Sequence, residues 1–157
     1  MKTRAAFNLV MILGVLISSF NVHGKKSDVD VVEETAHQMG ISSSRVRESL
    51  SSCDASQWAM NVCSQYYWIE QDILMNNVIK NVLEDLDGSS SREKFLLAQE
   101  SWVNFRDRDC EYRASGVEGG TMHAMVELDC KRDLTKARIL ELKEFRTCRS
   151  PGCPGSQ

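Results

Sequence analysis

The sequence predicts a small all-α protein, an antiparallel three-helix bundle stapled by disulfides. Apolar residues recur at three- and four-residue steps between about residues 56 and 145, which is the period of an amphipathic helix. Glycine-containing breaks near residues 88 and 116–120 divide this region into three parts, and it has no strand pattern of any length. Six cysteines, an even number, follow an N-terminal segment of the kind that directs export, which favours disulfides.

Residues 1–24 have the order of a secretory signal peptide. Lys2 and Arg4 precede an apolar run from Leu9 to Phe20, and Gly24 stands before a basic pair. This run has about 12 residues, whereas a membrane-spanning helix needs about 20, so cleavage is favoured over an uncleaved anchor. No cysteine near the cleavage site offers a lipoprotein anchor. The mature protein is therefore expected in the periplasm or outside the cell, with no membrane anchor.

The mature chain is acidic. Removing residues 1–24 takes two basic residues and no acidic one, which leaves 17 Lys and Arg against 22 Asp and Glu, a net charge of −5. This balance argues against nucleic acid as a partner and is compatible with a basic protein. The remaining 133 residues have room for one domain with one core.

Residues 25–52 are polar and Ser-rich, with few large apolar side chains. We expect them to be a mobile leader to the folded domain, because such a segment can bury little apolar surface. The alternative is a short helix that ends at Gly40, followed by another turn that includes Val46 and Leu50.

The first predicted helix runs from about Ser56 to Gly88. Its apolar stripe drifts slowly around the helix and consists of Ala59, Val62, Cys63, Tyr66, Ile69, Ile73, Leu74, Val78, Val82 and Leu86. Gly88 is placed to end the helix in a left-handed turn. Ser90 and Glu93 have the spacing of a capping box, which predicts the start of the next helix.

The second predicted helix ends at about residues 113–115, before Gly116. At 100° per residue, one of its faces is apolar but includes polar groups; its members are Phe95, Ala98, Gln99, Trp102, Phe105, Arg106, Asp109 and Cys110. Trp102 and Phe105 are predicted to be core residues, and a role as a binding platform is the alternative.

A short turn, GVEGG, leads to the third predicted helix, which Thr121 is placed to cap. The expected inward face of this helix consists of Met122, Val126, Cys130, Leu134, Ala137 and Leu140. The folded domain is predicted over residues 53–146. Residues 147–157 contain both prolines and form a predicted tail, in which Cys148 and Cys153 could close a small loop.

All cysteines lie in the mature part and are predicted to be disulfide-bonded; they are Cys53, Cys63, Cys110, Cys130, Cys148 and Cys153. Short turns make consecutive helices antiparallel, and bridged Cα atoms must lie within about 7 Å. Folding the first helix onto the second favours Cys63 with Cys110, and Cys53 with Cys130. The second-ranked alternative pairs Cys110 with Cys130 across the second turn.

No catalytic, metal or cofactor site is predicted. The sequence has no nucleophile elbow, zinc-protease motif, phosphate-binding glycine loop or paired-carboxylate signature. Only His37 and His123 offer imidazole bases after export, and the cysteine spacing does not match a zinc site. We therefore expect a protein that is not an enzyme.

The ordered motif of this chain resembles the LprI-type lysozyme-inhibitor-like family, from about Cys53 to Phe145. The matching positions are Cys53, Met60, Asn61, Cys63, Ala98, Gln99, Trp102, Phe105, Arg106, Asp107, Cys110, Gly119, Gly120 and Cys130. The last two cysteines, Cys148 and Cys153, are additional to the family pattern. The resemblance implies a small exported helical protein of the bacterial envelope, with lysozyme or another basic wall-active protein as its partner.

The motif or a neighbouring turn supplies the candidate binding residues Gln99, Trp102, Arg106, Asp107, Gly119 and Gly120. For the buried-face residues the alternative role is mutual pairing within the bundle, and for the glycines it is a tight turn. The turns Asp87 to Ser91 and Ser115 to Gly120 could enter an enzyme cleft, and the sequence does not select between them. The alternative function is a non-enzymatic secreted binding module for another envelope or host partner.

Overall fold

The computed structural model describes residues 30–148, 150, 152 and 153, and the predicted signal peptide lies outside them. The described chain is all-helical and contains no strand. Its elements are α1 (Val31–Met39), α2 (Ser43–Leu50), α3 (Gln57–Asp85), α4 (Ser91–Ala114), the short 3-10 helix η1 (Ser115–Val117) and α5 (His123–Thr147). The all-α prediction is confirmed, but the fold contains two helices more than the predicted three-helix bundle.

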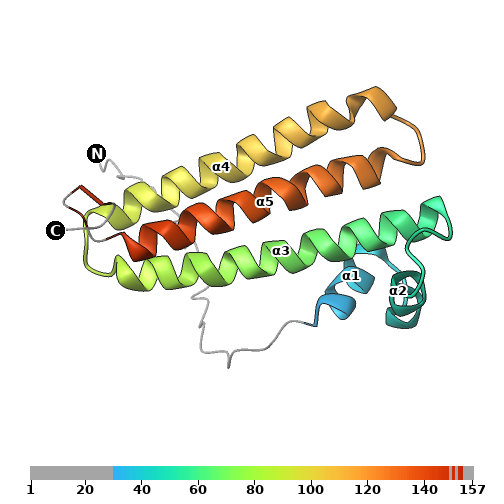
Figure 1. The fold of residues 1–157 in the computed structure, drawn as a ribbon, viewed down its shortest axis with the longest axis horizontal. Coiled ribbons are helices and arrows are strands. Elements are labelled where there is room, and N and C mark those ends of the chain that lie inside the picture. Colours follow the sequence, from blue (N-terminus) through green and yellow to red (C-terminus); the bar gives the residue numbers. More distant parts are fainter. Residues whose placement is uncertain (1–29, 149, 151, 154–157) are drawn as a thin grey trace, which may run out of the picture.

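Helices α3, α4 and α5 are long and lie side by side, with α5 between the other two in Figure 1. α3 and α5 run in the same direction, because Asn61 contacts Thr121 near their starts and Asp85 contacts Arg146 near their ends. α4 runs in the opposite direction. Their shared core consists of Met75, Val78, Val82, Leu86, Ile139 and Leu142, with Ile79, Phe95, Trp102 and Phe145 packed against it.

Residues 30–52 form two helices, which corrects the expectation of a mobile leader. α1 begins at the N-cap Asp30 and ends at Gly40, whose φ of 65° is the left-handed conformation that glycine adopts readily. α1 and α2 pack against α3, where a second core forms from Ala36, Val46 and Val62 together with Val32, Met39, Ile41, Leu50 and Tyr66. The segment buries its few apolar residues because α3 supplies the rest of this core.

α3 therefore serves two cores with different parts of its surface. Its N-terminal part places Val62 against α1 and α2, and its C-terminal part places Val78 and Val82 against α4 and α5. The slow drift of the apolar stripe thus coincides with a change of packing partners. The predicted stripe is wrong at Leu74, which is exposed, whereas its neighbour Met75 is buried.

The inward faces of α4 and α5 are narrower than the predicted ones. Phe105 is 56% exposed and its neighbour Arg106 is buried; Leu140 is 63% exposed and its neighbour Ile139 is buried. Met122, also predicted to face inward, is exposed. Successive helical residues point about 100° apart, so an arc drawn one residue too wide includes solvent-facing side chains.

The predicted start of α4 is correct, because Ser90 is its N-cap residue, but the Ser90 side chain makes no capping hydrogen bond. The Ser89 hydroxyl instead accepts one from the Ser91 N–H at 3.2 Å. The predicted Thr121 cap is wrong. α5 begins after Met122 and has no side-chain cap. The Thr121 backbone carbonyl instead accepts a hydrogen bond from the Asn61 side-chain amide at 3.0 Å. Ser56 does cap α3, and Gly88 follows that helix with a φ of 71°.

The disulfides pair cysteines that are near in sequence, and they are Cys53–Cys63, Cys110–Cys130 and Cys148–Cys153. The predicted Cys63–Cys110 and Cys53–Cys130 bridges are wrong, because Cys110 faces α5 rather than the start of α3. The second-ranked pairing across the α4–α5 turn and the small loop of the tail are correct. Among the described residues, no helix is long and apolar enough to cross a membrane.

Candidate functional site

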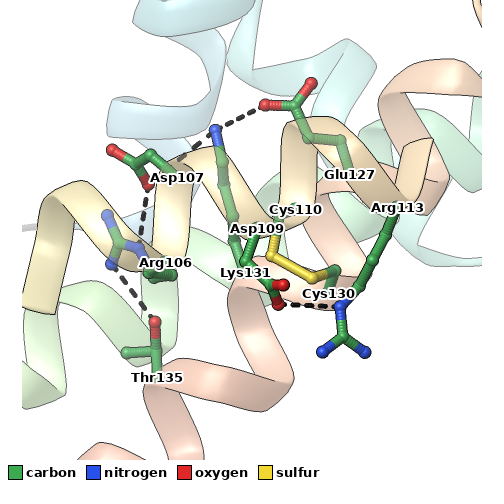
Figure 2. The surroundings of a disulfide bond; sticks show 9 residues. All are labelled: Arg106, Asp107, Asp109, Cys110, Arg113, Glu127, Cys130, Lys131 and Thr135. Atoms are coloured by element: carbon green, nitrogen blue, oxygen red, sulfur yellow. Dashed lines mark hydrogen bonds and ion pairs between the residues drawn. A yellow bond between two sulfur atoms is a disulfide. The ribbon is translucent and has the colours of Figure 1, made fainter. Parts of the chain in front are cut away.

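The buried centre of the three long helices is organised around Arg106 of α4, whose side chain is only 5% exposed. Its Nη1 donates to Asp72 Oδ1 of α3 at 2.9 Å and to Thr135 Oγ1 of α5 at 3.2 Å. Its Nε donates to Asp107 Oδ1 at 3.0 Å, and Figure 2 shows the contacts with Asp107 and Thr135. The Arg106 guanidinium therefore joins α3, α4 and α5. Hydrogen bonds that involve a charged group are stronger than those between neutral groups.

Aromatic rings and cations alternate along the same interior. The Arg106 guanidinium lies 5.9 Å from the Trp68 ring centroid and 5.6 Å from that of Trp102. The Arg138 guanidinium lies 5.7 Å from the Trp102 ring centroid and 5.8 Å from the Phe145 ring centroid. Cation–π attraction is largest where both groups are withdrawn from water. These side chains therefore hold α3, α4 and α5 together.

The buried Gln99 amide is paired at both ends. Its Oε1 accepts from Arg138 Nε at 3.1 Å, and its Nε2 donates to Met75 Sδ at 3.7 Å. Three predicted binding residues, Gln99, Trp102 and Arg106, thus use their polar or aromatic groups inside the bundle. None of them lines the open groove between the C-terminal part of α4 and the N-terminal part of α5.

The two predicted binding glycines shape the turn between α4 and α5. Gly119 has a φ of 73°, and a Cβ on Gly120 would lie 3.1 Å from the Val117 carbonyl oxygen. Both residues are exposed. The turn therefore needs its glycines for backbone geometry, and it presents an exposed edge beside them.

An open groove of about 670 Å³ lies next to this turn, between the C-terminal part of α4 and the N-terminal part of α5. We call it the acidic groove, because four of its lining residues are carboxylates. It is lined by Asn104, Asp107, Arg108, Glu111, Tyr112, Ser115, Glu118, His123, Glu127 and Lys131. Asp107 is the predicted binding residue that lines it.

The inner part of the acidic groove is an ion-paired cluster. Lys131 Nζ lies 2.6 Å from Glu127 Oε1 and 4.0 Å from Asp107 Oδ1, as Figure 2 shows. His123 Nδ1 lies 3.8 Å from Glu127 Oε2. Asp107 also accepts from the buried Arg106, so the groove connects to the interior through this carboxylate.

The rim of the acidic groove faces solvent. Tyr112 is 76% exposed, which is the largest exposed fraction among the exposed large hydrophobic residues of the described chain. Glu111 pairs with Arg108 at 3.0 Å, and both side chains are mostly exposed. Glu118, on the turn, forms no ion pair with another described residue. An aromatic side chain beside exposed carboxylates can contact a basic protein surface.

A disulfide fixes the two walls of the acidic groove. Cys110 is fully buried on α4 and bonds Cys130 of α5, with a Cα–Cα distance of 5.5 Å. Each cysteine is adjacent to a lining residue, Glu111 or Lys131. In Figure 2 the bridge lies beside Lys131, and it joins α4 to α5 along the groove.

The described residues offer no nucleophile of the thiol type and no metal cluster. Each described cysteine is in a disulfide, and no group of three His, Cys, Asp or Glu side chains in this part of the chain could hold a metal ion. His37 is exposed on α1 and distant in sequence from His123, whose imidazole lies beside Glu127.

These features define a small helical domain stapled by disulfides, with a polar interior and an acidic groove at one end. The chain belongs to the family described as lysozyme inhibitor LprI, whose model matches residues 51–142. It is also 30% identical over 102 residues to the uncharacterized protein R02472 of Rhizobium meliloti (strain 1021), covering 57% of this chain and 73% of that protein. No solved structure matches the chain.

Most of the acidic groove escaped the sequence prediction. Glu111 and Tyr112 lie outside the family motif and off the apolar face, so periodicity gave no reason to select them. Glu118 was indicated only as part of the turn from Ser115 to Gly120. A usable signal was present: an exposed tyrosine and two carboxylates surround a glycine-rich turn. The disulfide between Cys110 and Cys130 brings that turn and the start of α5 together.

Proposed function

We propose that this protein is exported and inhibits a lysozyme or a related wall-cleaving enzyme, with the acidic groove and turn 115–120 as its binding surface. One observation carries the proposal. The family match over residues 51–142 includes every residue that lines the acidic groove. Disulfides are typical of oxidising compartments, which supports export.

The chemistry of the surface supports a basic partner. Exposed carboxylates at Glu111 and Glu118 would hasten encounter with a basic enzyme, because complementary charge mainly increases the association rate. Tyr112 offers a large apolar contact, and tyrosine is enriched among residues that dominate binding energy. In this mechanism the turn and Tyr112 cover the sugar-binding cleft, and inhibition is steric.

The two turns that could enter a cleft differ in their surroundings. Turn 115–120 adjoins the four carboxylates of the acidic groove. The turn from Asp87 to Ser91 lies at the opposite end of the bundle, beside a groove lined by the cations Lys94, Arg138 and Arg146. A basic enzyme would be attracted to the first end more than to the second, so we assign turn 115–120 to the interface.

A wall-lysis assay with purified mature protein tests the proposal. Wild-type protein should slow the loss of turbidity when it is equimolar with the enzyme. The double variant Glu111→Lys/Glu118→Lys should bind about tenfold more weakly, with the difference shrinking at high salt. Glu100→Lys is the matched control, since Glu100 is exposed on α4 outside the groove, and it should inhibit within about twofold of wild type.

The outcomes separate the two candidate functions. No inhibition by wild-type protein at stoichiometric excess, across several lysozyme types, would remove the inhibitor function. Capture of an envelope or host protein without any effect on lysis would favour the alternative binding module. Recovery of the chain from the periplasm with Lys25 as its first residue would support export and cleavage.

A further inference from the structure

A second groove lies at the other end of the bundle, where α3 ends, α4 begins and α5 ends. Its volume is about 420 Å³, within the range of small-molecule sites. We call it the apolar groove, and it is lined by Val82, Asp85, Leu86, Ser91, Lys94, Phe95, Ala98, Arg138, Phe145 and Arg146. Ala98 is the one position of the family motif in this lining.

The floor of the apolar groove is continuous with the main core. Val82 and Leu86 belong to that core and are buried, and Phe95 and Phe145 pack against it. Ala98 is exposed at the edge, and its small side chain leaves the hollow open. An apolar ligand would therefore extend the core rather than rest on a polar surface.

The rim of the apolar groove carries more positive than negative charge. Its ionic lining residues are three cations and one carboxylate, Asp85, which accepts from Arg146 Nε at 2.7 Å. Arg138 pairs with Glu141 at 2.8 Å beside the lining. Lys94 is exposed on the first turns of α4 and forms no ion pair with another described residue. An ammonium group at the mouth of an apolar hollow complements an anionic head on an apolar tail.

We propose that the apolar groove binds a medium-chain fatty acid, with the acyl chain between Phe95 and Phe145 and the carboxylate at Lys94. The span from Arg138 to Arg146 on α5 is eight residues, about 12 Å at the helical rise, which suits a chain of medium length. This binding is separate from the proposed inhibitor function, because the two grooves lie at opposite ends of α4.

Calorimetric titration with decanoate, below its micelle concentration, tests the proposal on the full mature chain. Decanoate should bind saturably with one site per chain, and each methylene removed from the ligand should weaken binding about fourfold. Lys94→Glu should weaken decanoate binding about tenfold and leave the neutral alcohol decanol unchanged. Lys136→Glu, a charge reversal at an exposed position of α5 outside the groove, should change neither.

A second variant tests the hollow itself. Ala98→Trp should abolish decanoate and decanol binding alike, while inhibition of wall lysis stays at the wild-type level. No saturable binding by the wild type, or equal weakening of acid and alcohol by Lys94→Glu, would overturn the proposal. So would a wild-type dimer in sedimentation equilibrium that Ala98→Trp dissociates, because the groove would then be an interface between copies of the chain.

Discussion

The bundle interior around Arg106 and the acidic groove are built from the same kinds of side chain and use them differently. In the interior, Arg106 is 5% exposed and binds groups on its own helix and on two others. In the groove, Arg108 is 83% exposed, and Glu111 is its one ion-pair partner among the described residues. The two arginines are two residues apart on α4, which places them about 200° apart around the helix.

This difference separates architecture from recognition within one helix. A buried charge must be paired by the protein itself, so it contributes to the fold and has little capacity left for a partner. An exposed ion pair contributes little to stability and can exchange its contacts when a partner arrives. We therefore infer that motif residues such as Gln99 and Arg106 preserve the scaffold, while binding lies in the less regular groove.

The largest expected effect comes from breaking the interior. Arg106→Leu leaves Asp72 without its cation, so the free energy of unfolding should fall by about 3 kcal/mol. Urea denaturation followed by circular dichroism measures this change. Arg108→Leu is the matched control and should stay within about 0.5 kcal/mol of wild type. If Arg106→Leu keeps wild-type stability but no longer inhibits lysis, Arg106 is a binding residue and our assignment of roles is reversed.

The next largest effect concerns the walls of the acidic groove. Replacing Cys110 and Cys130 with serine opens a loop of 20 residues, which should cost about 3 kcal/mol of stability by loop entropy. The same change at Cys148 and Cys153, only five residues apart, should cost about 2 kcal/mol or less. Inhibition should weaken only for the first pair. Equal loss of inhibition from both pairs would show that the tail takes part in binding.

A smaller effect should follow from truncating one aromatic side chain of the groove. Tyr112→Ala should weaken inhibition about tenfold while the free energy of unfolding changes by less than about 0.5 kcal/mol. Phe105→Ala is the control, since Phe105 is also an exposed aromatic of α4 but does not line the groove. Dose–response curves for wall lysis compare the two. A greater loss from Phe105→Ala would move the interface to the outer face of α4.

The smallest expected effect lies in the second core, at Tyr66. Burial raises the pKa of the Tyr66 phenol above its ordinary value of 10.0, and the charges of Glu70, Tyr67 and Asp30 act in the same direction. The folded state thus favours the neutral phenol, so this contribution to stability is complete below pH 10 and is lost as pH rises through the raised pKa. Denaturation at increasing alkaline pH should show a steeper loss of stability for wild type than for Tyr66→Phe. If wild type and Tyr66→Phe lose stability equally as pH rises, the raised pKa of Tyr66 is contradicted.

Much of the helical architecture could be predicted from local sequence signals. The three-residue and four-residue periods defined α3, α4 and α5, and Gly88 and Gly116 marked their ends. The family pattern also identified the family, which the match over residues 51–142 confirms. Helix periods and helix ends depend on residues that are close in sequence, so they can be predicted without knowing which surfaces pack together.

The remaining features depend on which surfaces meet, and the sequence did not determine that. Residues 30–52 form helices because α3 offers them a second apolar face, which a count of their own apolar residues does not reveal. Cys53 pairs with Cys63 because the chain turns back just before α3, bringing their Cα atoms to 5.9 Å. Tyr112 and Glu118 share a groove only because α5 packs beside α4.

Hydrogen exchange of the mature protein with and without a saturating lysozyme tests the central claim most directly. We predict protection of backbone amides at residues 108–123, around Tyr112 and turn 115–120, with no change at residues 86–95. Protection at residues 86–95 instead, or an inhibited enzyme with no protection at residues 108–123, would contradict the assignment of recognition to the acidic groove.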